Sequence, residues 1–202
     1  MNYLAHAFLS GNSDELLVGN LIGDFVKGRI SEGFSPGIRE GVMLHRQIDS
    51  YTNDHSGATS ARNRFSRERR RFAGIILDIC FDHFLIQHWN RYTDTRLSSF
   101  VDGVFRRIQP YQDIFRGRLP FSLTRENLGY LLETNQDLDG VVFTLSRISN
   151  RLRNGNALLN ALGEIKAMYD QLEADFINFF PDLIHYTCSL HPDLQVPFQP
   201  SP

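Results

Sequence analysis

The sequence predicts an all-α fold, namely a single-domain helical bundle over residues 1–190 followed by an extended, proline-rich tail over residues 191–202. Apolar residues recur at intervals of three and four along most of the chain, which is the period of an amphipathic helix. No segment alternates apolar and polar residues over a useful strand length. A chain of 202 residues with a hydrophobic content of 42% suits one buried core.

The first part of the chain contains three predicted helical segments. Residues 2–9 form a short apolar segment, and residues 14–26 carry leucine, isoleucine and phenylalanine at helical spacing. Ser35 and Pro36 then match an N-cap residue followed by proline at the first helical position. We therefore expect a third helix to begin there.

The longest predicted element runs from residue 65 to residue 92. Its second half, residues 75–86, is apolar nearly all round, which is typical of a helix buried on most of its faces. Asp78, Asp82 and His83 lie inside this apolar run. Because burial of an ionised carboxylate is strongly unfavourable without a partner, these side chains need a neighbour that offsets their charge.

Apolar spacing predicts four further helices, over residues 97–109, 124–135, 137–153 and 156–180. Pro181 follows the last of them. Proline lacks a backbone donor and clashes with the preceding turn, so we expect the helix to end before it. The four prolines in the tail indicate an extended conformation.

Composition and charge exclude several classes of protein. A net charge of -2 argues against a chain that binds nucleic acid by overall electrostatics. Cys80 and Cys188 lack the spacing of a zinc or redox motif, so we expect two reduced thiols. The N-terminus lacks the features of a signal peptide, and no stretch reaches about 18 apolar residues. We therefore expect a cytoplasmic protein that binds neither membrane nor nucleic acid, while its oligomeric state stays open.

The spacing of histidine and aspartate predicts a metal centre. His45 and Asp49 are four residues apart, so a helix places them on one face. Asp78 and Asp82 have the same spacing, and His83 lies about 100° further round the helix. Imidazole and carboxylate together suit a divalent cation, and such a site could hold Mn²⁺, Fe²⁺, Mg²⁺ or Zn²⁺.

His6 and Asp24 also lie among apolar neighbours near the start of the chain. Taken alone, a core histidine is more often hydrogen-bonded within the core, and an aspartate beside a glycine turn is usually a helix cap. The interpretation as a metal centre requires that these two residues lie close to the His45–Asp49 pair and to the group of Asp78, Asp82 and His83 in the folded chain.

The segment 62–71 contains six arginines and one glutamate. One interpretation is a solvated helix face. The other is a docking surface for an acidic partner or for phosphates, because the guanidinium fork matches those oxyanions. The second interpretation assigns partner binding to Arg67, Arg69, Arg70 and Arg71.

Four ordered motifs resemble the acyl carrier protein phosphodiesterase family, namely the opening Met1–His6, Gly19–Gly28, His45–Asp49 and Leu77–Leu85. The resemblance spans roughly residues 1–185. It implies an all-helical fold related to the HD-type metal phosphohydrolases, and hydrolysis of the phosphodiester that joins 4′-phosphopantetheine to a serine of holo acyl carrier protein. It also implies a divalent metal, typically Mn²⁺.

The positions that match the family motifs are His6, Asp24, His45, Asp49, Asp78, Asp82 and His83. On this resemblance we expect His45, Asp49, Asp78 and Asp82 to bind the metal, and His6, Asp24 and His83 to transfer protons or contact the phosphate. Two features depart from the family pattern. The chain has Thr52-Asn53 where a Thr-Asp pair is usual, and Asp82-His83 reverses the order of the HD motif.

Two other functions are compatible with the residues alone. An HD-type hydrolase could act on a nucleotide or another small phosphodiester with the same metal. A helical module could instead hold acidic proteins on its arginine-rich face without any catalysis. Chelation of the metal separates the enzymes from the binding module, and a comparison of holo acyl carrier protein with nucleotides separates the two enzymes.

Overall fold

The computed structural model describes residues 2–119, 122–152, 156–192, 194 and 196. Within these residues the chain is all-helical and contains no β-strand, which confirms the predicted fold class. The α-helices of the first half are α1 (Tyr3–Phe8), α2 (Asp14–Ile22), α3 (Pro36–Asp54), α4 (Ser56–Arg64) and α5 (Ala73–Gln87). Those of the second half are α6 (Leu97–Ile108), α7 (Gln112–Phe115), α8 (Arg125–Glu133), α9 (Leu138–Ser149), α10 (Asn156–Leu159), α11 (Ala161–Ala167) and α12 (Tyr169–Leu190).

Short 3₁₀ turns join several of these helices. They are η1 (Gly23–Phe25), η2 (Arg70–Phe72), η3 (Trp89–Arg91), η4 (Gln109–Tyr111) and η5 (Thr134–Gln136). None of the helices in the described ranges has both the length and the apolar character that a membrane crossing requires. Cys80 is buried, Cys188 is half-buried, and both are free thiols as predicted.

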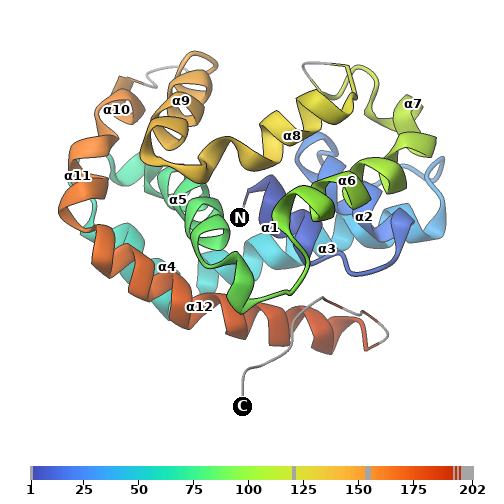
Figure 1. Ribbon diagram of the computed structural model, residues 1–202, viewed down its shortest axis with the longest axis horizontal. Coiled ribbons are helices and arrows are strands. Elements are labelled where there is room, and N and C mark those ends of the chain that lie inside the picture. Colours follow the sequence, from blue (N-terminus) through green and yellow to red (C-terminus); the bar gives the residue numbers. More distant parts are fainter. Residues whose placement is uncertain (1, 120–121, 153–155, 193, 195, 197–202) are drawn as a thin grey trace.

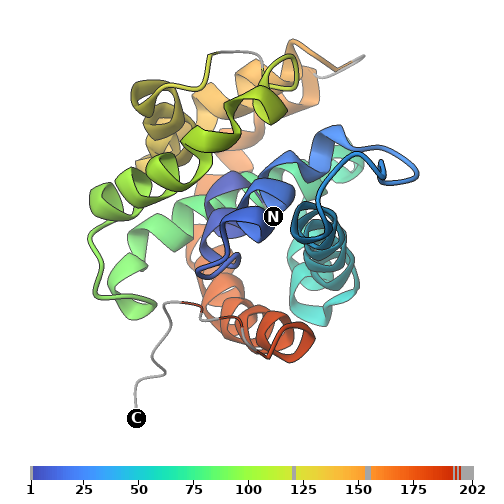
Figure 2. The same ribbon diagram turned by 90° about the vertical axis from the view of Figure 1, so that its right-hand side faces the viewer.

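The helices surround a central pair, α1 and α5. Figure 1 shows α8 and α9 along one edge of the molecule and α12 along the opposite edge, and Figure 2 shows the same order from the side. The last helix packs on α3, α4 and α5, while α1 contacts α2, α5 and α8. Because α1 is enclosed in this way, every residue from Leu4 to Phe8 is buried, including His6.

Helices α2 and α3 pack unusually closely through two glycines. A Cβ atom on Gly19 would lie 2.7 Å from the Cα of Gly41, and one on Gly41 would lie 2.8 Å from the Cα of Gly19. No side chain fits between backbones at that separation. The contact brings residue Asn20 of α2 against the face of α3 that carries His45.

The predicted burial of the segment 75–86 is confirmed, but the predicted limits of its helix are wrong. Helix α5 begins at Ala73 rather than at residue 65, because the chain first forms α4, a turn and η2. Helix α4 was not predicted, since its sequence is short and rich in serine, asparagine and arginine. It packs on α12 and buries Ala58 and Ala61.

The expectation that Pro181 ends its helix is also wrong. The segment predicted as one helix over 156–180 divides into α10, α11 and α12, and α12 continues through Pro181 to Leu190. A proline inside a helix costs about 3 kcal/mol relative to alanine. Buried side chains on both sides of it, among them Phe180 and Leu183, keep α12 packed on the core and outweigh that cost. The predicted extended tail lies mostly outside the described residues.

Candidate active site

Three side chains from two helices converge at the buried end of α1. His6 of α1 lies opposite His45 and Asp49 of α3, and one ligand atom from each lies within 4.8 Å of the others. The Nε2 atoms of His6 and His45 are each 3.3 Å from an oxygen of Asp49. The predicted helical pairing of His45 with Asp49 is therefore present, and His6 joins it from a separate helix.

Asn20 fixes the orientation of both imidazole rings. Its amide nitrogen donates to the carbonyl of His6 and to Ser10 Oγ, both at 2.9 Å, which leaves its amide oxygen as an acceptor. That oxygen accepts from His6 Nδ1 at 2.7 Å, and the main-chain carbonyl of Asn20 accepts from His45 Nδ1 at 2.8 Å. The Nδ1 atom of each ring therefore carries a proton, and both Nε2 atoms face Asp49. Metal-binding histidines are held by this kind of outer hydrogen bond.

The donor set fits a divalent cation. His6 Nε2 is a buried atom with no hydrogen-bond partner, although a carboxylate oxygen of Asp49 lies 3.3 Å away. An imidazole lone pair that faces a carboxylate at this distance is unfavourable unless a positive charge lies between them. Two imidazole nitrogens and a carboxylate are the ligands that borderline divalent metals prefer.

Asp24 lies at the exposed side of this cluster. One of its oxygens is 3.6 Å from His45 Nε2, and its side chain is 60% exposed. The nearby His45 lowers the pKa of Asp24 below its usual value. Asp24 is therefore an ionised carboxylate at neutral pH, within reach of both the cluster and solvent.

The charges in the cluster are strongly coupled. Burial, followed by the nearby His45, lowers the pKa of His6, so the His6 ring is neutral. Burial alone would lower the pKa of His45, but hydrogen bonds to Asp24 and Asp49 raise it to about 9. Burial raises the pKa of Asp49, but the neighbouring His45 and His6 outweigh this and hold it well below its usual range. A metal would take the place of the proton that His45 shares with the carboxylates.

Gly23 provides the space for His45. A Cβ atom at Gly23 would lie 2.5 Å from the Cβ and Cδ2 atoms of His45. The cluster therefore depends on four residues of the segment 19–24. Two glycines provide space and the other two are polar neighbours of the imidazoles, namely Gly19, Gly23, Asn20 and Asp24. Sequence reasoning did not assign a role to Asn20. The available signal was an amide inside the apolar run 16–22 of α2, since a buried amide needs several hydrogen-bond partners.

Asp82 is buried on α5 but contacts the backbone of α1 instead of joining the cluster of ligand atoms. Its two oxygens accept from the N–H groups of Leu4 and Ala5 at 3.0 and 3.2 Å. Burial raises the pKa of Asp82 to about 7, although these two hydrogen bonds lower it. The carboxylate thus caps the helix that carries His6.

Asp78 and His83 are likewise outside the group of ligand atoms found among the described residues. Asp78 is half-buried one turn before Asp82. His83 Nδ1 donates to the carbonyl of Asn135 in η5, and its Nε2 accepts from the hydroxyl of Tyr169, both at 2.8 Å. Both nitrogens of His83 therefore bind groups that connect α5 to η5 and α12.

The arginine-rich segment is not one continuous helix face, because α4 ends at Arg64 and η2 begins at Arg70. Arg69 forms an ion pair with Glu164 of α11 and donates to the carbonyl of Asn160 at 3.1 Å. The side chains of Arg67, Arg70 and Arg71 are exposed. Asn53, which departs from the family pattern, accepts from Arg62 through its amide oxygen.

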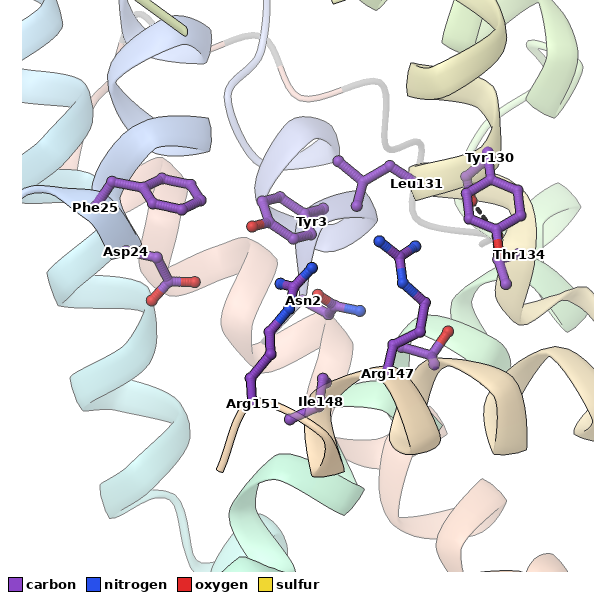
Figure 3. A pocket seen from close by; sticks show the side chains of 11 residues that line it. Asn2, Tyr3, Asp24, Phe25, Tyr130, Leu131, Thr134, Arg147, Ile148 and Arg151 are labelled. Carbon is purple, nitrogen blue, oxygen red and sulfur yellow. Dashed lines mark hydrogen bonds between the residues drawn. The ribbon is translucent and has the colours of Figure 1, made fainter. Parts of the chain in front are cut away.

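A pocket opens beside Asp24, between the start of the chain and helices α8 and α9. Figure 3 shows Asp24 and Phe25 on one side, Tyr3 in the middle, and two arginines reaching in from the opposite wall. The described lining residues are Asn2, Tyr3, Asp24, Phe25, Tyr130, Leu131, Thr134, Thr144, Arg147, Ile148 and Arg151. The pocket and the histidine cluster therefore meet at Asp24.

Comparison with known proteins agrees with the motifs. The family described as "Acyl carrier protein phosphodiesterase" matches residues 1–183. Relatives named acyl carrier protein phosphodiesterase from Salmonella paratyphi A and Serratia proteamaculans are 35% and 33% identical, over 91% of this chain and 96% of theirs. No solved structure matches the chain, so the HD-phosphohydrolase-like assignment stays a prediction. The chain belongs to the acyl carrier protein phosphodiesterase family.

Proposed function

We propose that this chain hydrolyses the phosphodiester that joins 4′-phosphopantetheine to a serine of holo acyl carrier protein. Family membership supports this substrate, and the relatives carry the name of that activity. The observation that carries the chemistry is the pair of imidazoles held by Asn20 with both Nε2 atoms facing Asp49.

We propose His6, His45 and Asp49 as the metal ligands, with Mn²⁺ as the ion and Mg²⁺, Fe²⁺ or Zn²⁺ as the alternatives. His6 thereby takes a ligand role in place of the proton transfer expected from the sequence. When bound, a divalent ion polarises a phosphoryl oxygen and lowers the pKa of water. Asp82 supports this set by capping α1, the helix that carries His6, whereas His83 holds η5 against α5.

Asp24 is our proposed proton-transfer group. Its carboxylate is ionised at neutral pH and lies between the cluster and the pocket, so it accepts a proton from the attacking water. The His45 ring stays in place during this step, because the carbonyl of Asn20 accepts a hydrogen bond from its Nδ1. The products are the apo carrier protein and 4′-phosphopantetheine.

The direct test is intact-protein mass spectrometry of holo acyl carrier protein after incubation with the purified chain. We expect loss of the phosphopantetheine mass with Mn²⁺ and no loss with a chelator. Cyclic and linear nucleotides incubated in parallel test the alternative hydrolase. Turnover of a nucleotide without any release of phosphopantetheine would contradict the proposed substrate, and release that survives chelation would contradict the metal.

A further inference from the structure

The pocket beside Asp24 combines positive charge with an apolar wall. Arg147 lies in the last turns of α9, and Arg151 follows four residues later in a turn. The backbone N–H of Arg151 donates to the carbonyl of Ile148 at 3.0 Å. This turn keeps both guanidinium groups on the same side of α9, and Figure 3 shows both reaching into the pocket.

The two arginines have no carboxylate partner within the described ranges of the chain, whereas Arg64, Arg107 and Arg125 each form an ion pair. Arg147 instead lies over the ring of Tyr130, with its guanidinium carbon 5.7 Å from the ring centroid. Two such arginines, one turn apart in a pocket, form a binding site for an anion with several oxygens.

Tyr3 lines the pocket between the two arginines and the side that adjoins the histidine cluster. Burial raises the pKa of Tyr3 to about 12, and the charges of Asp24 and Arg151 act on its hydroxyl in opposite directions. Figure 3 shows the Tyr3 hydroxyl pointing toward the side of the pocket that Asp24 and Phe25 form, with Arg151 reaching into the same space. An anion held by Arg151 would lie next to the proposed proton-transfer group.

The remainder of the wall is apolar and partly open to solvent. Phe25 is 37% exposed and Tyr130 is 46% exposed, which is a large apolar exposure for side chains that line one pocket. Leu131 and Ile148 complete this wall. A ligand that fits it carries a phosphate at one end and an uncharged, flexible chain at the other.

We propose that this pocket binds the phosphopantetheine arm of the substrate, with Arg147 and Arg151 on the phosphate and the apolar wall on the pantetheine chain. The inference rests on the proposed function and adds the residues that select the substrate. With the phosphate beside Asp24 and the arm inside the pocket, the serine of the carrier protein lies at the mouth. Arg147 and Arg151 are substrate-binding residues that lie outside the proposed metal ligands.

Calorimetry with free 4′-phosphopantetheine and with pantetheine, which lacks the phosphate, tests the pocket without any turnover. We expect the wild-type chain to bind phosphopantetheine at least about tenfold more tightly than pantetheine. The Arg147→Ala/Arg151→Ala double variant should lose that difference and bind both compounds alike. A lysine pair at the same positions should restore part of the preference, because it keeps the charge but not the fork.

Kinetics with holo carrier protein separate this proposal from the proposed function. The double alanine variant should raise KM by about tenfold or more while its Mn²⁺ affinity stays at the wild-type value. Arg116→Ala, which changes an exposed arginine outside this pocket, should change neither quantity. A melting curve confirms that each variant is folded.

The outcomes are distinct for the two proposals. The pocket assignment would be overturned, and the proposed function retained, if the wild-type chain released phosphopantetheine while the double variant kept the wild-type KM and ligand preference. A wild-type chain that releases nothing, yet binds phosphopantetheine through these arginines, would support the pocket while the function fails. Tighter binding of adenosine monophosphate than of phosphopantetheine, lost in the double variant, would reassign the pocket to nucleotides.

Discussion

The imidazole rings of His6 and His45 stack with centroids 4.1 Å apart and planes inclined by 17°. They come from different helices, and Asn20 of a third helix holds both through their Nδ1 atoms. Two protonated imidazoles at this distance would repel each other, so the pair favours a single shared cation.

Asn20→Ala should weaken Mn²⁺ binding by about 10- to 100-fold, because His6 loses the acceptor that fixes its tautomer and ring orientation. Titration calorimetry measures the affinity, and Asn63→Ala, which changes an exposed asparagine, serves as the control. Wild-type affinity in a folded Asn20→Ala variant would show that the amide has no part in holding the metal.

His6→Ala and His45→Ala should each abolish metal binding and phosphodiester hydrolysis, because each removes one of the three proposed ligands. Asp78→Asn should keep the metal, because Asp78 is outside the group of converging ligand atoms. Metal analysis of the purified variants decides between this set and the one expected from the sequence. Loss of the metal in Asp78→Asn with retention in His6→Ala would favour the latter.

Gly23→Ala should displace the His45 ring, since the new methyl group would lie 2.2 Å from the Cγ atom and 2.5 Å from the Cδ2 atom of that ring. We expect a loss of about 1–3 kcal/mol in the free energy of unfolding, together with weaker metal binding and lower activity. Gly103→Ala is the matched control, because nothing lies within 4 Å of a Cβ atom there. Equal stability and activity in the two variants would contradict the close packing of Gly23 on His45.

We expect one residue of the arginine-rich segment to stabilise the fold and others to bind the carrier protein. Arg69→Ala should lower the free energy of unfolding by about 1–2 kcal/mol, because it breaks a partly buried ion pair with Glu164. Charge reversal at the exposed Arg70 and Arg71 should instead raise KM for the acidic carrier protein, most strongly at low salt. A KM that is unchanged at every salt concentration would remove this surface from carrier-protein binding.

Cys80 should not react with a thiol reagent at pH 8 in the folded chain. Burial raises its pKa to about 12, so only about one part in ten thousand is thiolate at that pH. Burial also raises the pKa of the half-buried Cys188, which should react slowly. Ellman's assay before and after denaturation measures this, and rapid native reaction of two thiols would contradict the burial of α5.

Several features were predicted from the sequence because they depend on local patterns. The helical fold follows from apolar spacing, and the buried character of residues 75–86 follows from their composition. Pro181 shows the limit of such reasoning, since buried residues on both sides of it keep α12 continuous against the local preference of proline.

The chain by itself determined an all-helical fold, the motifs of its family, and a set of seven histidines and aspartates from which the site was to be drawn. Helical spacing joins His45 to Asp49, but it joins Asp78 to Asp82 equally well, and nothing local distinguishes the two pairs. Only the tertiary structure shows that the first pair belongs to a group of converging ligand atoms and that the second does not. The close contact of α2 with α3 and the burial of α1 bring His6 to the first pair, and Asp82 becomes the cap of α1. Contacts between distant segments depend on how the helices pack, which the spacing of residues along one helix does not specify.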